Sequence, residues 1–312
     1  MPLSGRHELL QAIQQLTRKH LHGKERPLRL AMVALLSGGH ILLEDIPGLG
    51  KTTMALALAN ALGLTFGRIQ CTSDLLPSDI TGLSVFNRET SAFTFVRGPI
   101  FSHILLIDEV NRAMPKTQSA LLEAMEERQV TVEGTTYPLP EPFMVIATQN
   151  PTEQVGTYPL PESQMDRFLV RTGMGYPPPD VEKEIIQSGS IRETLRHIPT
   201  MVTAAEILAA RAAVAGITIA PTVVDYIYRI VAATREHPQV QTGISTRGAI
   251  NLAEAAKVQA YLAGRAFVIP EDVQEMVVPV SAHRLVLGGE LENPDKEQLL
   301  RVIIATIPVP RS

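Results

Sequence analysis

The sequence of 312 residues predicts an α/β domain followed by a smaller all-α domain. Two observations predict the first domain: short apolar runs typical of buried strands alternate with helical patterns, and a glycine-rich loop joins one of these strands to a helix. A third observation divides the chain, because the prolines of Tyr176-Pro-Pro-Pro179 can continue neither a helix nor a central strand. We therefore expect a core over residues 1–178, a linker at its end, and a helical domain over 179–312.

The N-terminal part of the core is expected to contain two helices, a strand and a third helix. Apolar residues recur at helical spacing over residues 8–21, and Arg29–Ser37 has the composition of a more buried helix. His40–Glu44 is a short apolar strand that leads into the glycine-rich loop Asp45–Thr53. The Ala/Leu-rich stretch Met54–Leu62 then predicts a helix that ends before Gly63.

Three more strands complete the expected sheet. His103–Asp108 is an apolar run that ends in an acid, as expected for a strand buried on both faces of a parallel sheet. Phe143–Ala147 has the same character, and Phe168–Val170 is a shorter version of it.

Two hairpins and a helix lie between these strands. Leu83–Phe101 has alternating apolar residues around a turn-like centre, and Gln129–Leu139 surrounds Glu133-Gly134. Thr117–Arg128 carries apolar residues on one face, which predicts a helix.

Beyond the linker the pattern is helical. Thr222-Val-Val-Asp225 has the form of a capping box that opens a helix. Ser245 is a candidate N-cap for a helix that ends near Gly264, and Pro270 is a candidate first residue of the next. Glu297–Ala305 predicts the last helix.

Composition and charge exclude several classes of protein. Hydrophobic residues make up 45% and charged residues 19%, which excludes a disordered chain. The net charge of −4 divides equally at Pro179, so neither part has the basic excess expected for nucleic acid or an anionic membrane. Cys71 is the only cysteine, which excludes an intrachain disulfide and a cysteine-rich zinc site. With neither a signal-peptide pattern nor a run near the ~20 apolar residues that span a bilayer, we expect a soluble cytoplasmic protein without membrane insertion.

The glycine-rich loop has the pattern of a phosphate-binding loop. Such loops close backbone N–H groups around phosphate oxygens at the N-terminus of a helix. Lys51 can reach the β- and γ-phosphates of ATP, and Thr52 can ligate Mg²⁺. Asp45 stands where the strict motif has glycine, which brings a negative charge near a polyanion unless the side chain turns away. A plain turn before a helix is the alternative, which the strand–loop–helix order disfavours. The candidate nucleotide-binding residues are Gly48, Leu49, Gly50, Lys51, Thr52 and Thr53.

Polar side chains at the ends of two strands supply the candidate chemistry. Asp108 can hold the shell of a Mg²⁺ ion, and Glu109 can act as general base on the water that attacks the γ-phosphate. Both follow a buried strand, at the sheet edge where α/β proteins bind ligands. Asn150 follows the third strand and could orient that water, although an Asn before Pro151 also simply starts turns. The combination predicts an ATP-hydrolysing site that uses ATP and Mg²⁺.

The sequence resembles the MoxR family of AAA+ ATPases over about residues 8–284. The longest matching stretches surround the phosphate loop and the acids, and they are far more specific than a bare phosphate loop. The matching stretches are His22–Glu25, Leu35–Thr52, Arg97–Phe101, Ile107–Ala113, Lys116–Glu127, Ala147–Pro151, Gly156–Glu162, Asp166–Phe168 and Gly243–Arg247.

The resemblance implies a fold and three residue roles. It implies a P-loop NTPase αβα core with strand order 5-1-4-3-2, an insert hairpin in helix 2, a second hairpin before the sensor strand, and a four-helix lid. Lys51 and Glu109 stay catalytic candidates, and Asn150 becomes sensor 1. Arg167 becomes an arginine finger for a neighbour's γ-phosphate, although by itself it would be read as a surface or salt-bridged Arg. Arg247 becomes sensor 2, which couples the lid to the nucleotide.

The resemblance also implies partners. A finger acting in trans implies a homo-oligomeric ring, expected to be a hexamer, in which ATP hydrolysis drives chaperone-like remodelling, maturation or activation of a client protein complex. A von Willebrand factor A domain protein is the partner that the family implies. Two alternatives stay open: an AAA+ motor subunit of a chelatase or Rubisco-activase-type system, and a nucleotide-gated scaffold without turnover.

Overall fold

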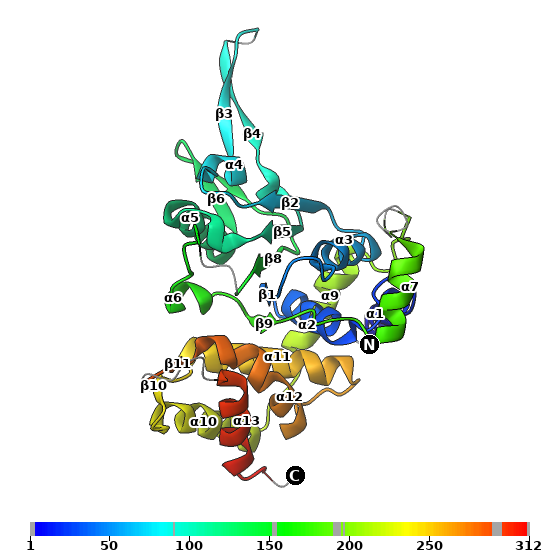
Figure 1. The fold of residues 1–312 in the computed structure, drawn as a ribbon, viewed down its shortest axis with the longest axis vertical. Helices are drawn as coiled ribbons and strands as arrows, with labels where there is room; N and C mark the ends of the chain where they lie inside the picture. Colours follow the sequence, from blue (N-terminus) through cyan, green and yellow to red (C-terminus); the bar gives the residue numbers. More distant parts are fainter. Residues whose placement is uncertain are drawn as a thin grey trace.

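The computed structural model describes residues 4–89, 91–151, 155–189, 195, 197–288 and 295–310. Figure 1 shows a central parallel sheet with helices on both faces, a long hairpin that projects from one end, and a group of helices packed against the other end. The α/β core followed by a helical lid is therefore confirmed.

The sheet has the predicted topology. Its five strands are all parallel and lie in the order β2-β5-β8-β1-β9, which is 5-1-4-3-2 when the sheet strands alone are numbered along the chain. The strands are β1 (Ile41–Glu44), β2 (Phe66–Gln70), β5 (Ile104–Asp108), β8 (Met144–Gln149) and β9 (Val170–Thr172).

The two faces of the sheet bury two different hydrophobic clusters. Alternation along β1 places Ile41 and Leu43 in one cluster and Leu42 in the other, and β5 and β8 alternate in the same way. The first cluster joins the N-terminal helices to the lid, and the second is covered largely by α5. The helices and 3₁₀ turns of the core are α1 (Ser4–Lys19), α2 (Glu25–Leu36), α3 (Lys51–Ala61), α4 (Pro77–Thr81), η1 (Pro99–Phe101), η2 (Val110–Arg112), α5 (Pro115–Glu127) and α6 (Glu162–Met165).

Both predicted hairpins are present. β3 (Gly82–Asn87) pairs with β4 (Ala92–Arg97), and β6 (Gln129–Val132) pairs with β7 (Thr135–Pro138). The β3–β4 hairpin follows α4 directly and projects beyond the rest of the chain (Figure 1).

The lid is helical, with one short antiparallel pair that was not predicted, β10 (Val240–Thr242) with β11 (Val286–Leu287). The proposed cap of α11 is confirmed, because the Ser245 hydroxyl accepts a hydrogen bond from Gly248 N at 3.0 Å. The elements beyond the linker are α7 (Pro179–Ser188), α9 (Ala204–Ala215), α10 (Pro221–Glu236), α11 (Thr246–Leu262), α12 (Pro270–Ser281), η3 (Ala282–Arg284) and α13 (Lys296–Thr306).

The predicted capping box at Thr222 is wrong. Helix α10 begins two residues earlier than a capping box at Thr222 would place it: its first residue is Pro221, and Ala220 is the N-cap, with no side-chain cap. Proline is favoured at the first helical position because it has no N–H to leave unpaired and its φ is already helical. Thr222 therefore lies inside the first turn.

Helix α9 was not predicted, although its start carries a capping box. Thr203 Oγ1 accepts from Glu206 N at 3.3 Å, and the Glu206 carboxylate accepts from Thr203 N at 2.7 Å. The helix packs against α1, α2 and α11, so it lies between the core helices and the lid (Figure 1). No helix in the described part of the chain combines the length and apolar character needed to cross a membrane.

Candidate functional site

The loop between β1 and α3 has the backbone that phosphate binding needs. Gly48 and Gly50 have φ values of +88° and +90°, a left-handed conformation that side chains disfavour. Gly50 is the N-cap of α3, and no side chain caps the helix there. The first N–H groups of α3 therefore face the pocket, where an anion can accept their hydrogen bonds.

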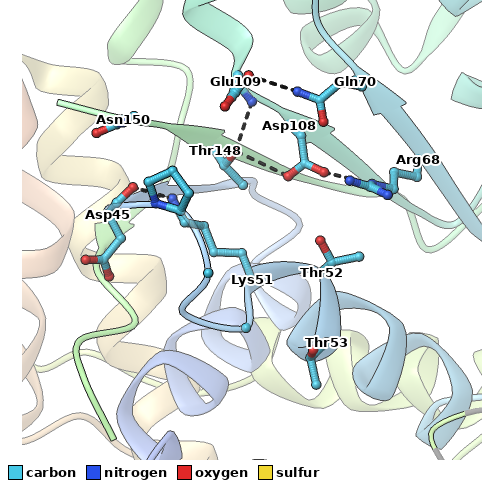
Figure 2. Close-up of a pocket in the computed structure, with 13 residues that line it drawn as sticks. Asp45, Lys51, Thr52, Thr53, Arg68, Gln70, Asp108, Glu109, Thr148 and Asn150 are labelled. Atoms are coloured by element: carbon cyan, nitrogen blue, oxygen red, sulfur yellow. Dashed lines mark hydrogen bonds and ion pairs between the residues drawn. The ribbon is translucent and has the colours of Figure 1, made fainter. Parts of the chain in front are cut away.

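Lys51 points into this pocket from the first turn of α3. Its ammonium group donates a hydrogen bond to the backbone carbonyl of Asp45 (Figure 2). Burial lowers the pKa of Lys51, while Asp45, Asp108 and Glu109 act to raise it. The surroundings therefore combine a partly desolvated cation with acids on the opposite wall, and a polyphosphate bound between them would be strongly attracted to the cation.

The unusual Asp45 turns its carboxylate away from the loop. The carboxylate accepts hydrogen bonds from the backbone N–H groups of Met174 and Gly175, the second at 2.9 Å. Figure 2 shows it pointing away from the Lys51 side chain. Lys24 binds the same segment through its carbonyl groups, because its ammonium donates to the carbonyl oxygens of Met174, at 3.2 Å, and Gly175. The acid in place of glycine thus anchors the start of the linker segment.

Asp108 and Glu109 lie side by side at the carboxyl end of β5 (Figure 2). Asp108 is buried; its carboxylate accepts from Arg68 Nε at 2.8 Å and from Thr148 Oγ1 at 3.3 Å. In the part of the chain that the structure describes, Glu109 is one of four residues other than glycine with a positive φ, which is +55°. Backbone strain of this kind at a strand end is typical of functional sites.

One oxygen of the Glu109 carboxylate, Oε2, is held by two neighbouring side chains. Gln70 Nε2 donates to its Oε2 at 2.9 Å, and Arg112 Nε lies 3.3 Å from the same oxygen. The Glu109 N–H donates to Thr148 Oγ1 at 2.9 Å, which fixes the backbone as well. The candidate general base is therefore oriented by groups on β2, η2 and β8.

Most of the residues predicted for the site line one cavity of about 280 Å³ between the loop and the strand ends. The predicted residues among its lining are Gly48, Gly50, Lys51, Thr52, Thr53, Asp108, Glu109 and Asn150. Leu49, also predicted, instead packs against the hydrophobic cluster beneath the loop.

The two predicted arginines lie together outside this cavity. Arg167 Nη1 is 3.0 Å from Glu126 Oε2 and donates to the Leu122 carbonyl oxygen at 2.8 Å. Arg247 Nη2 donates to the other Glu126 oxygen at 2.8 Å. Both arginines and Glu126 line a second cavity of about 260 Å³, between α5 and the start of α11. One glutamate on α5 therefore bridges the finger candidate and the sensor 2 candidate.

Comparisons with known proteins agree with this geometry. The family model for the "ATPase family associated with various cellular activities (AAA)" matches residues 40–170, and the "AAA lid domain" matches residues 232–303. The chain is 44% identical to the uncharacterized protein YeaC of Bacillus subtilis, over 97% of this chain and 96% of the relative. It is 39% identical to the chaperone MoxR1 of Mycobacterium tuberculosis, over 98% and 83%. The chain belongs to the MoxR family of AAA+ ATPases.

A solved structure shares the whole fold of this MoxR-family chain. The crystal structure of a candidate ATPase from Cytophaga hutchinsonii superposes with a TM-score of 0.91 at 38% identity, over 99% of this chain and 97% of that chain. The arrangement of core and lid described above is thus shared with an experimentally solved relative.

The MoxR-family site fits a Mg²⁺ ion held jointly with phosphates. Thr52 and Asp108, the predicted ligands, line the same cavity. Among the described residues, no three His, Cys, Asp or Glu side chains gather as a metal site. Mg²⁺ is commonly bound in this way, through one or two protein oxygens, waters and substrate phosphates.

Sequence reasoning missed four residues that organise the MoxR-family site. Arg68 and Gln70 come from β2, a strand that was not predicted, and Thr148 lies within β8, whose predicted extent ended at Ala147. Glu126 lies in a stretch that matches the family, but nothing in that stretch indicates that Glu126 would pair with Arg167 and Arg247. Alternation along β2 could have found the first two, because residues 68 and 70 share one side of the strand.

Proposed function

We propose that this MoxR-family chain is a Mg²⁺-dependent ATPase. The observation that carries the proposal is one cavity in which Lys51, on an uncapped helix start, faces the paired acids Asp108 and Glu109. A phosphate chain on the loop would place its γ-phosphate between the cation and the acids. Bound Mg²⁺, held by Thr52 and Asp108, would neutralise charge on the β- and γ-phosphates.

In the proposed reaction, Glu109 takes a proton from water as the water oxygen bonds to the γ-phosphorus. The bond from that phosphorus to the β,γ-bridging oxygen breaks, and its electron pair stays on ADP. Asn150 is proposed to orient the water, and Lys51 to stabilise charge on the phosphate oxygens. Because Gln70 and Arg112 hold one Glu109 oxygen, activity requires the other oxygen to face the water.

We further propose that each active site is completed by a neighbouring copy in a ring, expected to be hexameric. Arg167 and Arg247 lie at the second cavity, away from the lining of the first. This placement supports a role for Arg167 as a finger that reaches the neighbour's γ-phosphate. Arg247 is the second residue of the lid helix α11 and is proposed to couple the lid to the nucleotide.

The proposed output is chaperone-like remodelling of a protein client. The β3–β4 hairpin supports this proposal, because it carries exposed apolar side chains on both faces: Leu83, Val85 and Val96 on one, Phe86 and Phe93 on the other. Exposed apolar groups suit a protein surface better than a phosphate backbone. The name of the relative chaperone MoxR1 agrees with this use. A von Willebrand factor A domain partner remains the partner that the family implies.

The test is a pair of variants of the assembled protein. Glu109→Gln should retain Mg²⁺-dependent binding of a fluorescent ATP analogue and lose at least about 100-fold in turnover, the usual contribution of a general base. Glu123→Gln, an exposed substitution on α5, is the matched control and should behave as the parent. An assembled parent chain that never hydrolyses ATP, with or without partner proteins, would leave only the nucleotide-gated scaffold.

The ring is tested by mixing. Arg167→Ala should lose turnover by about 10³-fold, the scale seen for arginine fingers. Mixed with Glu109→Gln, it should regain part of the activity, because some interfaces then pair an intact Glu109 with an intact Arg167. Mixtures that stay as inactive as either variant alone would refute completion of the site in trans.

A further inference from the structure

Arg284 is a lid residue that grips the backbone around Arg167. It lies in η3 at the end of α12, and only 2% of its side chain is exposed. Its Nη2 donates to the carbonyl oxygens of Asp166, at 3.0 Å, and Phe168, at 2.7 Å. Its Nε donates to the Asp166 carboxylate at 2.7 Å. One guanidinium thus binds the residues on both sides of the proposed finger.

The contact needs the planar fork of an arginine. Burial of a guanidinium is costly unless its donors are satisfied, and here carbonyl and carboxylate oxygens accept from all three nitrogens. Burial lowers the pKa of Arg284, and the charge of Asp166 opposes that shift. A lysine could keep the charge but could not bond to the Asp166 carboxylate and to carbonyls on both sides of Arg167 at once.

The stem of Arg284 also passes against the helix that carries Arg247. A Cβ placed on Gly248 would lie 2.9 Å from Arg284 Cδ, which is closer than real side chains approach. Glycine at this position therefore lets the stem cross the first turn of α11. In Arg247, the residue just before Gly248, Nη1 lies 4.0 Å from Asp166 Oδ2.

These contacts form one connected group between lid and core. The lid contributes Arg247 and Arg284, and the core contributes Asp166, Arg167 and Glu126. Arg284 and Asp166 fix the backbone beside Arg167, and Glu126 orients its side chain. The elements on either side of this segment contact the lid, because α12 packs against β9 and η3 packs against α6; Figure 1 shows α11 and α12 below the core.

We propose that Arg284 is a positioning residue for Arg167, so that the lid of each subunit sets where its own finger meets the next subunit's nucleotide. This inference rests on the proposed function, in which Arg167 acts in trans. The competing explanation is that Arg284 merely docks the lid on the core, as a structural ion pair. The two differ in one respect: a positioning defect falls on the neighbour's site and leaves the subunit's own nucleotide site intact.

Arg284→Lys is the test variant. Turnover should fall by about 10- to 100-fold, the scale expected when a catalytic group is displaced by about 1 Å, while affinity for the ATP analogue stays within about twofold. Asp166→Asn, which keeps the shape and removes the charge that Arg284 grips, is the second variant if Arg284→Lys folds poorly. Arg265→Lys is the matched control, because Arg265 forms an ion pair with Asp272 within the lid at 2.6 Å. It should leave turnover unchanged.

Two mixtures locate the defect. Mixed with Glu109→Gln, Arg284→Lys should regain activity, because its own intact site then meets an intact finger. Mixed with Arg167→Ala, it should not regain activity, because neither subunit offers a well-placed finger. The opposite pattern, or no recovery in either mixture, would overturn the positioning role, as would full activity of Arg284→Lys alone. The pair Arg167→Ala with Glu109→Gln reports separately on the trans site, so failure of that pair points to the proposed function instead.

Discussion

Acidification should destabilise the chain through His40, a buried histidine directly before β1. Burial, reinforced by the nearby Arg128 guanidinium, lowers the pKa of His40 from 6.5 to about 3. Both nitrogens of the neutral ring form hydrogen bonds: Nδ1 accepts from Val145 N at 3.0 Å, and Nε2 donates to the Met125 carbonyl at 3.2 Å. A proton on Nδ1 would cost the first of these bonds and place a charge in the core.

The size of the effect follows from the shift of the pKa. In the unfolded chain His40 takes up a proton near pH 6.5, whereas in the fold it does so near pH 3. The His40 contribution to the free energy of unfolding is therefore fully present above pH 6.5 and is lost as the pH falls toward 3. At pH 5, about 1.5 units below the unfolded value, the loss is about 2 kcal/mol.

The assay is urea unfolding at pH 7.5 and pH 5.0, followed by far-ultraviolet circular dichroism because the chain has no tryptophan. His40→Asn keeps an acceptor near the Nδ1 position and does not titrate, so it should be less stable at both pH values but lose about 2 kcal/mol less on acidification. His7→Asn, at an exposed position of α1, is the control and should follow the parent. A difference below about 0.5 kcal/mol between the pH effects on the parent and His40→Asn would refute the reasoning.

Two further predictions concern groups that hold the acids of the site. In the proposed site, Arg68 competes with Mg²⁺ for the Asp108 carboxylate, and such a half-exposed ion pair is worth up to about 1 kcal/mol. Arg68→Met should therefore lower the Mg²⁺ concentration needed for half-maximal ATP-analogue binding by about two- to fivefold, and Arg68→Lys should lower it less. An unchanged or higher Mg²⁺ requirement in Arg68→Met would contradict this competition. Gln70→Ala removes one of the groups that orient the Glu109 carboxylate, so turnover, measured as phosphate release, should fall by about two- to tenfold. Unchanged or higher turnover would mean that Gln70 does not hold Glu109 in its active orientation.

The sequence was most informative where burial is complete. β5 and β8 are almost entirely buried, so their residues form uninterrupted apolar runs that predict strands from local sequence. β2 lies at one edge of the sheet and has a single buried residue, Ile69, so its apolar signal is weak. Because Arg68 and Gln70 belong to that strand, missing the strand also meant missing two residues that hold the acids of the candidate site.

Tertiary contacts account for the other gaps. Local sequence placed Asp45 near a bound polyanion, but its direction depends on the N–H groups of residues 174 and 175, about 130 positions away. The grouping of Arg167, Arg247 and Glu126 likewise depends on how the lid packs on the core. Patterns of period two or 3.6 carry no information on such contacts between distant segments.

Ion pairs among the described residues suggest how bound ligands would replace protein groups at the candidate site. Arg68 pairs with the carboxylate of Asp108, the proposed Mg²⁺ ligand, and Glu126 binds Arg167 and Arg247, the arginines proposed to meet phosphate. In each case the partner has the same sign of charge as the proposed ligand. Binding then replaces one favourable ion pair by another, so neither Asp108 nor the two arginines must stand unpaired in a partly desolvated site. Since Glu126 holds a core arginine and a lid arginine at once, a phosphate that displaced it from either one would alter the contact between core and lid.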